Sequence, residues 1–287
     1  MKEYFKYKYD DLFNPTLIAL HTLGGSGTVN EIEEQVALSL NLSDKQIDEI
    51  HRNNITKLSY RLAWARNYLK RYGLLINSAR GIWTLTEEGL KKKSVEQEAV
   101  KRKVVALDKL ERRPAKKSAS AEQIDNLDSE EIQRFSWQEQ IIEELKKIPA
   151  EAFERLCQRL LRELGFQNVD VTGRSHDEGI DGKGILKVGG ILSFHVIFQA
   201  KRYKGSVSSS VIRDFRGAMI GRADKGIIIT TGTFTSEARK EAQRAGTSPI
   251  DLIDGNDLAE HLKELKLGVD IELVEKIEIK RDWFKSV

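Results

Sequence analysis

The spacing of apolar residues in the first 90 positions predicts a mainly helical domain that ends in a hairpin. Three segments carry apolar side chains at a period near 3.6, the period of a helix with one buried face. A Gly-Gly-Ser-Gly run stops the first segment, and Gly73 follows the third as a C-cap. Two short apolar runs then flank a turn. The expected elements are helices at 14–23, 28–40 and 58–69 and strands at 74–76 and 82–85.

From about residue 136 onward, helical and strand-like segments alternate. The run 226–231 is almost continuously apolar, which is typical of a strand buried on both faces. The order is one helix, three strands, and then helix, strand, helix, strand and helix, which favours a mixed sheet flanked by helices. We expect strands at 168–172, 180–188, 192–201, 226–231 and 250–253, and helices at 153–164, 207–220, 236–245 and 256–265.

A polar segment separates the two cores. Residues 91–135 include Arg-Pro-Ala-Lys-Lys-Ser-Ala-Ser at 113–120, and they are basic first and acidic afterwards. We therefore expect domains at 1–90 and 136–287, joined by a linker over 91–135. Three helices followed by a hairpin is the element order of a winged helix, whereas the second domain is of the α/β class.

Charge is distributed unevenly although the formal net charge is only +3. The third predicted helix with its flanks, 56–72, holds five basic residues and no acidic one. Phosphate contacts require cations on an exposed face, so this pattern favours DNA binding by that helix. A winged helix used for protein contacts is the alternative. The candidate DNA-binding residues are Lys57, Arg61, Arg66 and Lys70 on the helix and Arg80 in the hairpin turn.

The composition narrows the class of protein. Its 287 residues are 40% hydrophobic and 32% charged, as in a folded globular chain. A single cysteine, Cys157, excludes an intramolecular disulfide and a Cys-rich zinc site. No apolar run approaches the roughly 18 to 20 residues of a membrane span, and the N-terminus lacks the apolar core of a signal peptide. We therefore expect a cytoplasmic protein without a membrane partner.

Candidate catalytic residues occur at the ends of two neighbouring predicted strands. Asp181 lies between glycines, and Gln199 and Lys201 share one face of the strand 192–201 because side chains alternate. If the strands form an antiparallel hairpin, Asp181 approaches both. Carboxylate and amide oxygens bind Mg²⁺, which lowers the pKa of a bound water, while an ammonium stabilises a phosphorane. By spacing alone, a strand-edge carboxylate and a solvated lysine are the favoured interpretation.

Taken together, short motifs in both predicted domains resemble the Mrr family of restriction endonucleases. The likeness covers most of the chain apart from the linker. Its N-terminal part resembles the family's winged helix, and its C-terminal part resembles the family's nuclease domain. The matching segments are 61–66, 80–86, 152–156, 164–166, 177–182, 199–203, 225–231, 252–255 and the tail 267–284.

The resemblance implies a restriction-endonuclease-like α/β/α core with a PD-(D/E)xK-type active site. In this family an Asp is followed by Gln-x-Lys, with Gln replacing the usual Glu, and Asp181, Gln199 and Lys201 match residue by residue. Glu154, in Phe-Glu-x-Leu, matches an acidic residue beside the site. The implied ligands of Mg²⁺ are Asp181, Gln199 and Glu154. His176 and Glu178 depart from the smaller residues expected before Asp181.

The resemblance further implies an endonuclease that restricts foreign, methylated double-stranded DNA. Nothing in the composition or spacing indicates a preference for methylated bases. Because cutting both strands calls for two active sites, we expect a homodimer or a larger homo-oligomer. Two alternatives remain open: a DNA-binding regulator with a non-catalytic nuclease-like domain, and a structure-specific DNA repair nuclease.

Overall fold

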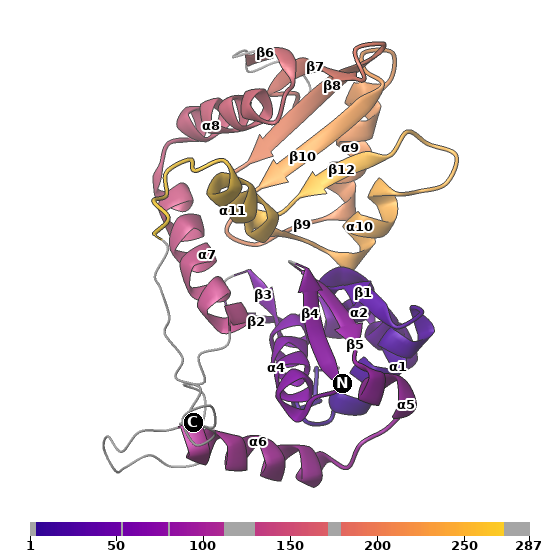
Figure 1. Cartoon of the computed structure of the whole chain (residues 1–287). Helices are drawn as coiled ribbons and strands as arrows, with labels where there is room; N and C mark the ends of the chain where they lie inside the picture. Colours follow the sequence, from indigo (N-terminus) through magenta and orange to yellow (C-terminus); the bar gives the residue numbers. More distant parts are fainter. Residues whose placement is uncertain (1–3, 53, 80, 112–129, 172–178, 273–287) are drawn as a thin grey trace.

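The computed structural model describes residues 4–52, 54–79, 81–111, 130–171 and 179–272. Figure 1 shows a helical N-terminal domain, coloured indigo to purple, beside a larger α/β domain, coloured pink to yellow. None of the helices in the described part combines the length and the apolar character that crossing a membrane requires.

The N-terminal domain is built from helices around a small antiparallel sheet with strand order β1-β5-β4. A capping box between Thr28 and Glu31 starts the second helix, and Gly73, at φ 98°, ends the fourth in the left-handed conformation. The elements are α1 (Phe13–Thr22), β1 (Ser26–Thr28), α2 (Val29–Ser39), α3 (Asp44–Ile47), β2 (Ile50–Arg52), β3 (Ile55–Thr56), α4 (Lys57–Tyr72), β4 (Leu75–Ala79), β5 (Ile82–Leu85), α5 (Glu87–Lys91) and α6 (Gln97–Glu111).

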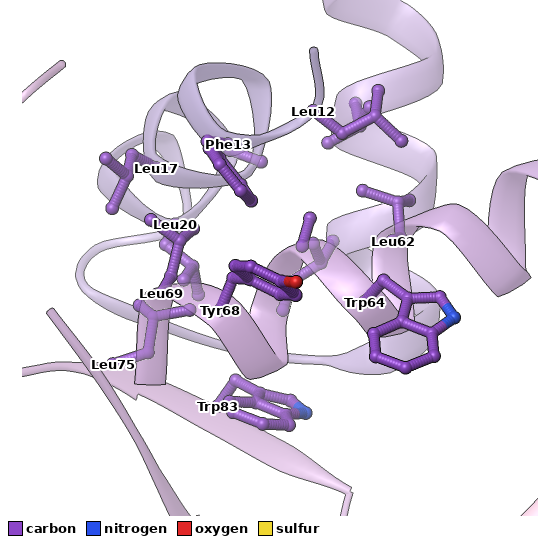
Figure 2. Packing of buried hydrophobic residues seen from close by; sticks show 14 of the residues in the cluster. Leu12, Phe13, Leu17, Leu20, Leu62, Trp64, Tyr68, Leu69, Leu75 and Trp83 are labelled. Carbon is purple, nitrogen blue, oxygen red and sulfur yellow. The ribbon is translucent and has the colours of Figure 1, made fainter. Parts of the chain in front are cut away.

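Aromatic and aliphatic side chains from α1, α4 and the hairpin form the core of this domain (Figure 2). The rings of Phe13 and Tyr68 stack with centroids 5.8 Å apart. Helix α6 adds Val100 and Val104, both fully buried, to the same core. The core therefore draws on residues beyond the predicted boundary at 90, and part of the predicted linker is a helix packed on the first domain.

The second domain contains a five-stranded mixed sheet of order β12-β10-β8-β7-β6. Strand β10 runs parallel to β8 and β12, whereas β7 is antiparallel to β8 and β6. This arrangement confirms the α/β fold class. The elements are α7 (Glu130–Lys147), α8 (Ala150–Glu163), β6 (Gln167–Val171), β7 (Gly182–Val188), β8 (Leu192–Lys201), β9 (Ser206–Val207), α9 (Ser209–Met219), β10 (Lys225–Thr230), β11 (Thr233–Phe234), α10 (Ser236–Ala242), β12 (Ile250–Ile253) and α11 (Gly255–Glu264).

Helices cover both faces of this sheet. Ile227 and Ile229 of β10 pack in the cluster that includes α8 and α11, while Ile228 packs in the cluster that includes α9 and α10. The three isoleucines are at most 6% exposed. Strand β10 is thus buried on both sides, as its apolar run predicted, and it provides a rigid support for its neighbour β8.

Candidate active site

The pairing of β7 with β8 brings Asp181 to the end of β8. Gly182 lies opposite Phe198 in this antiparallel pair, so Asp181 immediately precedes the paired part of β7 and lies beside the end of β8. The Asp181 amide donates to the Phe198 carbonyl at 3.0 Å, and its carboxylate Oδ2 accepts from the Ala200 amide at 2.7 Å. The predicted hairpin is confirmed, and its backbone holds the Asp181 carboxylate at the end of β8.

Gln199 is held in one orientation and carries an orphaned oxygen. The side chain is 7% exposed, and its Nε2 donates to the Gly179 carbonyl. Its Oε1 is buried and has no hydrogen-bond partner among the described residues. A buried acceptor left without a partner costs about 1–3 kcal/mol, so Oε1 is poised to accept a donor or to bind a cation.

Gly179 makes this orientation possible. Its φ is +82°, and a Cβ built there would lie 2.5 Å from Gln199 Nε2. Both the left-handed backbone and the close approach therefore require glycine. The sequence places glycines on both sides of Asp181, but the contact of Gly179 with the amide of Gln199 depends on how β8 packs beside it.

Lys201 ends β8 and is fixed through its backbone. Its carbonyl accepts a hydrogen bond from Thr230 Oγ1 at 2.8 Å and another from the Thr231 amide at 3.2 Å. Thr230 is also its register partner across the parallel pair. The two threonines had no signal in the sequence analysis, because their role depends on which strands are neighbours.

Two acidic side chains meet at this end of the sheet. Glu154 follows Phe153 on α8, at the border of the helix face that Phe153 and Cys157 bury. Burial, and to a smaller extent the Asp181 charge, raise the pKa of Glu154. Burial also raises the pKa of Asp181, although the Ala200 amide and the Lys201 charge oppose this rise. The carboxylates are therefore close enough to repel each other, and a bound cation would relieve that repulsion.

The donor atoms fit a hard divalent cation. Asp181 and Glu154 supply carboxylate oxygens and Gln199 supplies the orphaned amide oxygen, which is the ligand chemistry that Mg²⁺ prefers. In the described part of the chain, no three His, Cys, Asp or Glu side chains gather into a metal site. The candidate set therefore combines two carboxylates with one amide oxygen.

The basic residues of α4 differ in accessibility. Lys70 is exposed and Arg61 is half-buried, so both can reach a ligand at the surface. The ammonium of Lys57 lies 2.6 Å from Glu49 and is partly neutralised by that carboxylate. Arg80, like His176 and Glu178 before Asp181, lies outside the described residues.

The expectation that Arg66 contacts DNA is wrong in this structure. The residue is 1% exposed, and its guanidinium carbon lies 5.7 Å from the centroid of the Trp83 ring. Arg66 comes four residues after Leu62 and three before Leu69, both fully buried, so it shares their side of the helix. The helical spacing of Arg66 from these two leucines already indicated that it is buried, whereas its charge alone did not.

Truncating Arg66 should therefore destabilise the N-terminal domain rather than weaken phosphate contacts. We expect Arg66→Ala to lower the free energy of unfolding by about 2 kcal/mol or more, because it leaves a cavity and removes the cation–π contact with Trp83. Urea denaturation followed by tryptophan fluorescence measures this loss. An unchanged midpoint, or a change in the salt dependence of DNA binding alone, would contradict the structural role.

Comparison with known proteins places both domains in one family. A family model described as a restriction endonuclease, the Mrr catalytic domain, matches residues 145–262. A second, the Mrr N-terminal domain, matches residues 9–94. The type IV methyl-directed restriction enzyme EcoKMrr of Escherichia coli (strain K12) is 28% identical over 304 residues, covering 96% of this chain and 98% of that protein.

Two solved structures of restriction endonucleases are distantly similar. The DNA modification-dependent enzyme AspBHI has a TM-score of 0.41 and 18% identity over 68% of this chain. MspJI in complex with a 27-mer oligonucleotide has a TM-score of 0.39 and 22% identity over 63% of this chain. The chain spans 57% and 40% of the length of these two proteins, respectively.

The family models match the two domains separately and in the same order along the chain, and the Escherichia coli relative matches nearly end to end. The chain belongs to the Mrr family of restriction endonucleases, enzymes that hydrolyse DNA.

Proposed function

We propose that this enzyme is a Mg²⁺-dependent endonuclease that cuts methylated double-stranded DNA at the site formed by Asp181, Gln199, Lys201 and Glu154. The observation that supports it best is the buried Gln199 Oε1, which has no hydrogen-bond partner in the described structure and belongs to the strand whose Ala200 amide holds the Asp181 carboxylate. Methylated DNA as the target is suggested by the methyl-directed enzyme that the chain resembles over 96% of its length. Since DNA is the substrate, the cytoplasm is the expected location.

Each side chain has a distinct role in this proposal. Asp181, Glu154 and Gln199 would hold Mg²⁺, which supplies positive charge at the scissile phosphate and acidifies a bound water. Lys201 orients the attacking water or stabilises the negative charge of the pentacovalent transition state. The Ala200 amide and the Gly179 carbonyl keep Asp181 and Gln199 in place before the substrate arrives, so little reorganisation is needed during the reaction.

A plasmid assay tests this function directly. Purified protein is incubated with methylated and with unmethylated plasmid, each with Mg²⁺ and with excess EDTA. We expect cleavage of the methylated plasmid only, and only with Mg²⁺. A folded protein that cuts neither plasmid would refute the proposed activity, and equal cutting of both would refute the preference for methylated DNA.

The N-terminal domain is proposed to act as a DNA-binding winged helix through the accessible cations of α4. Neutralising Arg61 and Lys70 together should flatten the salt dependence of DNA affinity, because each lost phosphate contact reduces the slope of log K against log salt by about 0.9. The expected reduction is about 1.8. Fluorescence anisotropy between low and moderate salt measures the slope.

The matched control is Lys187→Ala, which removes an exposed lysine near the end of β7 distant from the Asp181 site. Its salt slope should equal that of the wild type. If the Arg61 and Lys70 variant also keeps the wild-type slope, α4 does not face the DNA and the N-terminal domain serves another purpose.

The enzyme is further proposed to act as a homodimer or a larger homo-oligomer, because one active site per chain cuts one strand at a time. Light scattering coupled to size-exclusion chromatography, with and without DNA, measures the mass. A monomer in both states that still makes double-strand breaks would contradict this assembly.

A further inference from the structure

The two domains contact each other through polar groups around β2, β3 and the start of α10. Asp48 accepts hydrogen bonds from the Ser236 amide, at 3.0 Å, and from its hydroxyl, at 2.7 Å. Lys240 lies 2.7 Å from Asp44 at the periphery. Figure 1 shows β2 and β3 of the first domain next to α7 of the second, where Arg52 pairs with Glu139 at 2.9 Å.

Asn54 is the most deeply buried of these contacts. It stands just before β3, is 6% exposed, and donates from Nδ2 to the Thr231 carbonyl at 2.6 Å and to the Gly232 carbonyl at 3.2 Å. These carbonyls belong to the turn between β10 and β11. A single amide group of the N-terminal domain therefore satisfies two backbone acceptors of the nuclease domain, in a place that water barely reaches.

The nuclease domain is shaped to receive this amide. A Cβ on Gly255 would lie 2.3 Å from Asn54 Nδ2 and 2.7 Å from the Thr231 carbonyl oxygen, so a larger residue would push Asn54 away. The Gly255 amide in turn donates to the Gly232 carbonyl at 2.9 Å. The first residue of α11 and the turn after β10 thus form a fitted receptor for one side chain.

The same turn holds Lys201. The Thr231 carbonyl accepts a hydrogen bond from Asn54, and the amide of the same residue donates to the Lys201 carbonyl. Thr230 Oγ1 donates to that carbonyl as well and also accepts from the Gly232 amide. Hydrogen bonds therefore connect Asn54 with the backbone of Lys201 through one turn.

We propose that Asn54 is a positioning residue for DNA cleavage, through which the docked N-terminal domain holds the β10–β11 turn and thereby Lys201 in place. The inference rests on the proposed role of Lys201 at the active site. In this arrangement the first domain is part of the support of the active site as well as its DNA-binding module. Loosening the turn would let the Lys201 ammonium drift from its working position.

Three variants of the full-length protein test this proposal. Asn54→Ala removes both interdomain hydrogen bonds, Asn54→Asp places a carboxylate against two carbonyls at nearly the same volume, and Gly255→Ala crowds both Asn54 and the Thr231 carbonyl that it contacts. We expect kcat at saturating methylated plasmid to fall by about 10- to 100-fold, because ångström-scale misplacement of a reacting group has effects of this size. KM, and DNA affinity without Mg²⁺, should change by less than about 3-fold, because the DNA-binding cations are untouched.

Lys240→Ala is the matched control, since it breaks an interdomain ion pair whose lysine side chain is 69% exposed and which contributes little. It should cut at the wild-type rate. Wild-type kcat in all three test variants, or a loss of affinity with kcat unchanged, would overturn the proposal. Circular dichroism verifies folding, and if one variant unfolds the other two still decide.

Hydrogen–deuterium exchange provides a readout that does not need cleavage. The Thr231 amide, which donates to Lys201, should exchange about tenfold faster in Asn54→Ala than in the wild type and remain unchanged in Lys240→Ala. If its protection is the same in all three proteins, Asn54 does not hold this turn, whatever the enzyme cuts. A wild-type enzyme that cuts no DNA would instead refute the proposed function, while exchange still tests the link to Lys201.

Discussion

Asp181→Ala should reduce DNA cleavage by about 10²- to 10³-fold while DNA affinity stays near that of the wild type. Losing a group that directly supports charge in the transition state has effects of this size. Asp181 lies just before β7 and accepts from the Ala200 amide of β8, and none of the α4 cations depends on it. Single-turnover cleavage and binding anisotropy, measured on the same preparation, separate the two effects. If the variant cuts at the wild-type rate, the active site lies elsewhere.

Asp181→Asn is the better control for folding, because its amide oxygen still accepts from the Ala200 amide that now contacts Asp181 Oδ2. Burial raises the pKa of Asp181 in the folded state. The ionised carboxylate therefore destabilises the metal-free fold at neutral pH, and this penalty disappears as pH falls through the raised pKa. We expect Asp181→Asn to unfold at a temperature equal to or above that of the wild type at pH 7 without metal.

The second large expected effect is on the Mg²⁺ concentration that cleavage requires when Gln199 is replaced. Gln199→Ala should raise the Mg²⁺ concentration for half-maximal cleavage by about 10-fold or more, because it removes the orphaned oxygen, and excess Mg²⁺ should partly restore the rate. Lys201→Ala should not be restored by any Mg²⁺ concentration, since no metal replaces the ammonium. A Mg²⁺ titration of the cleavage rate distinguishes the two residues.

Gln199→Glu provides a second test of whether residue 199 binds the metal. A carboxylate binds Mg²⁺ more strongly than an amide, so the Mg²⁺ midpoint should fall. In the metal-free protein, however, one carboxylate oxygen would take the place of Nε2, which now donates to the Gly179 carbonyl. Mg²⁺ should therefore raise the unfolding temperature of this variant more than that of the wild type. If the alanine and glutamate variants both keep the wild-type midpoint, Gln199 is not a metal ligand.

Local pattern was sufficient to predict the strands that carry the candidate site. Strand β8 has the predicted bounds, and its antiparallel hairpin with β7 brings the Asp181 carboxylate to the Ala200 amide, next to Gln199 in the chain. Alternation along one strand and antiparallel pairing between neighbours in sequence involve only short-range geometry. The same holds for the end of α4 at Gly73, where the left-handed cap is a local property of glycine.

The features that the sequence did not predict depend on long-range packing. The position of Arg66 in the core, the attachment of α6 to the first domain and the contact of Asn54 with Thr231 all depend on segments far apart in sequence. The charge and the apolar periodicity of a segment are properties of that segment alone, whereas its burial depends on which other segments pack against it. For this protein the apolar pattern predicted the main helices and strands and the candidate site residues, whereas the folded structure shows which cations remain accessible and which distant groups hold the Lys201 backbone, because burial and hydrogen bonding join segments far apart in sequence.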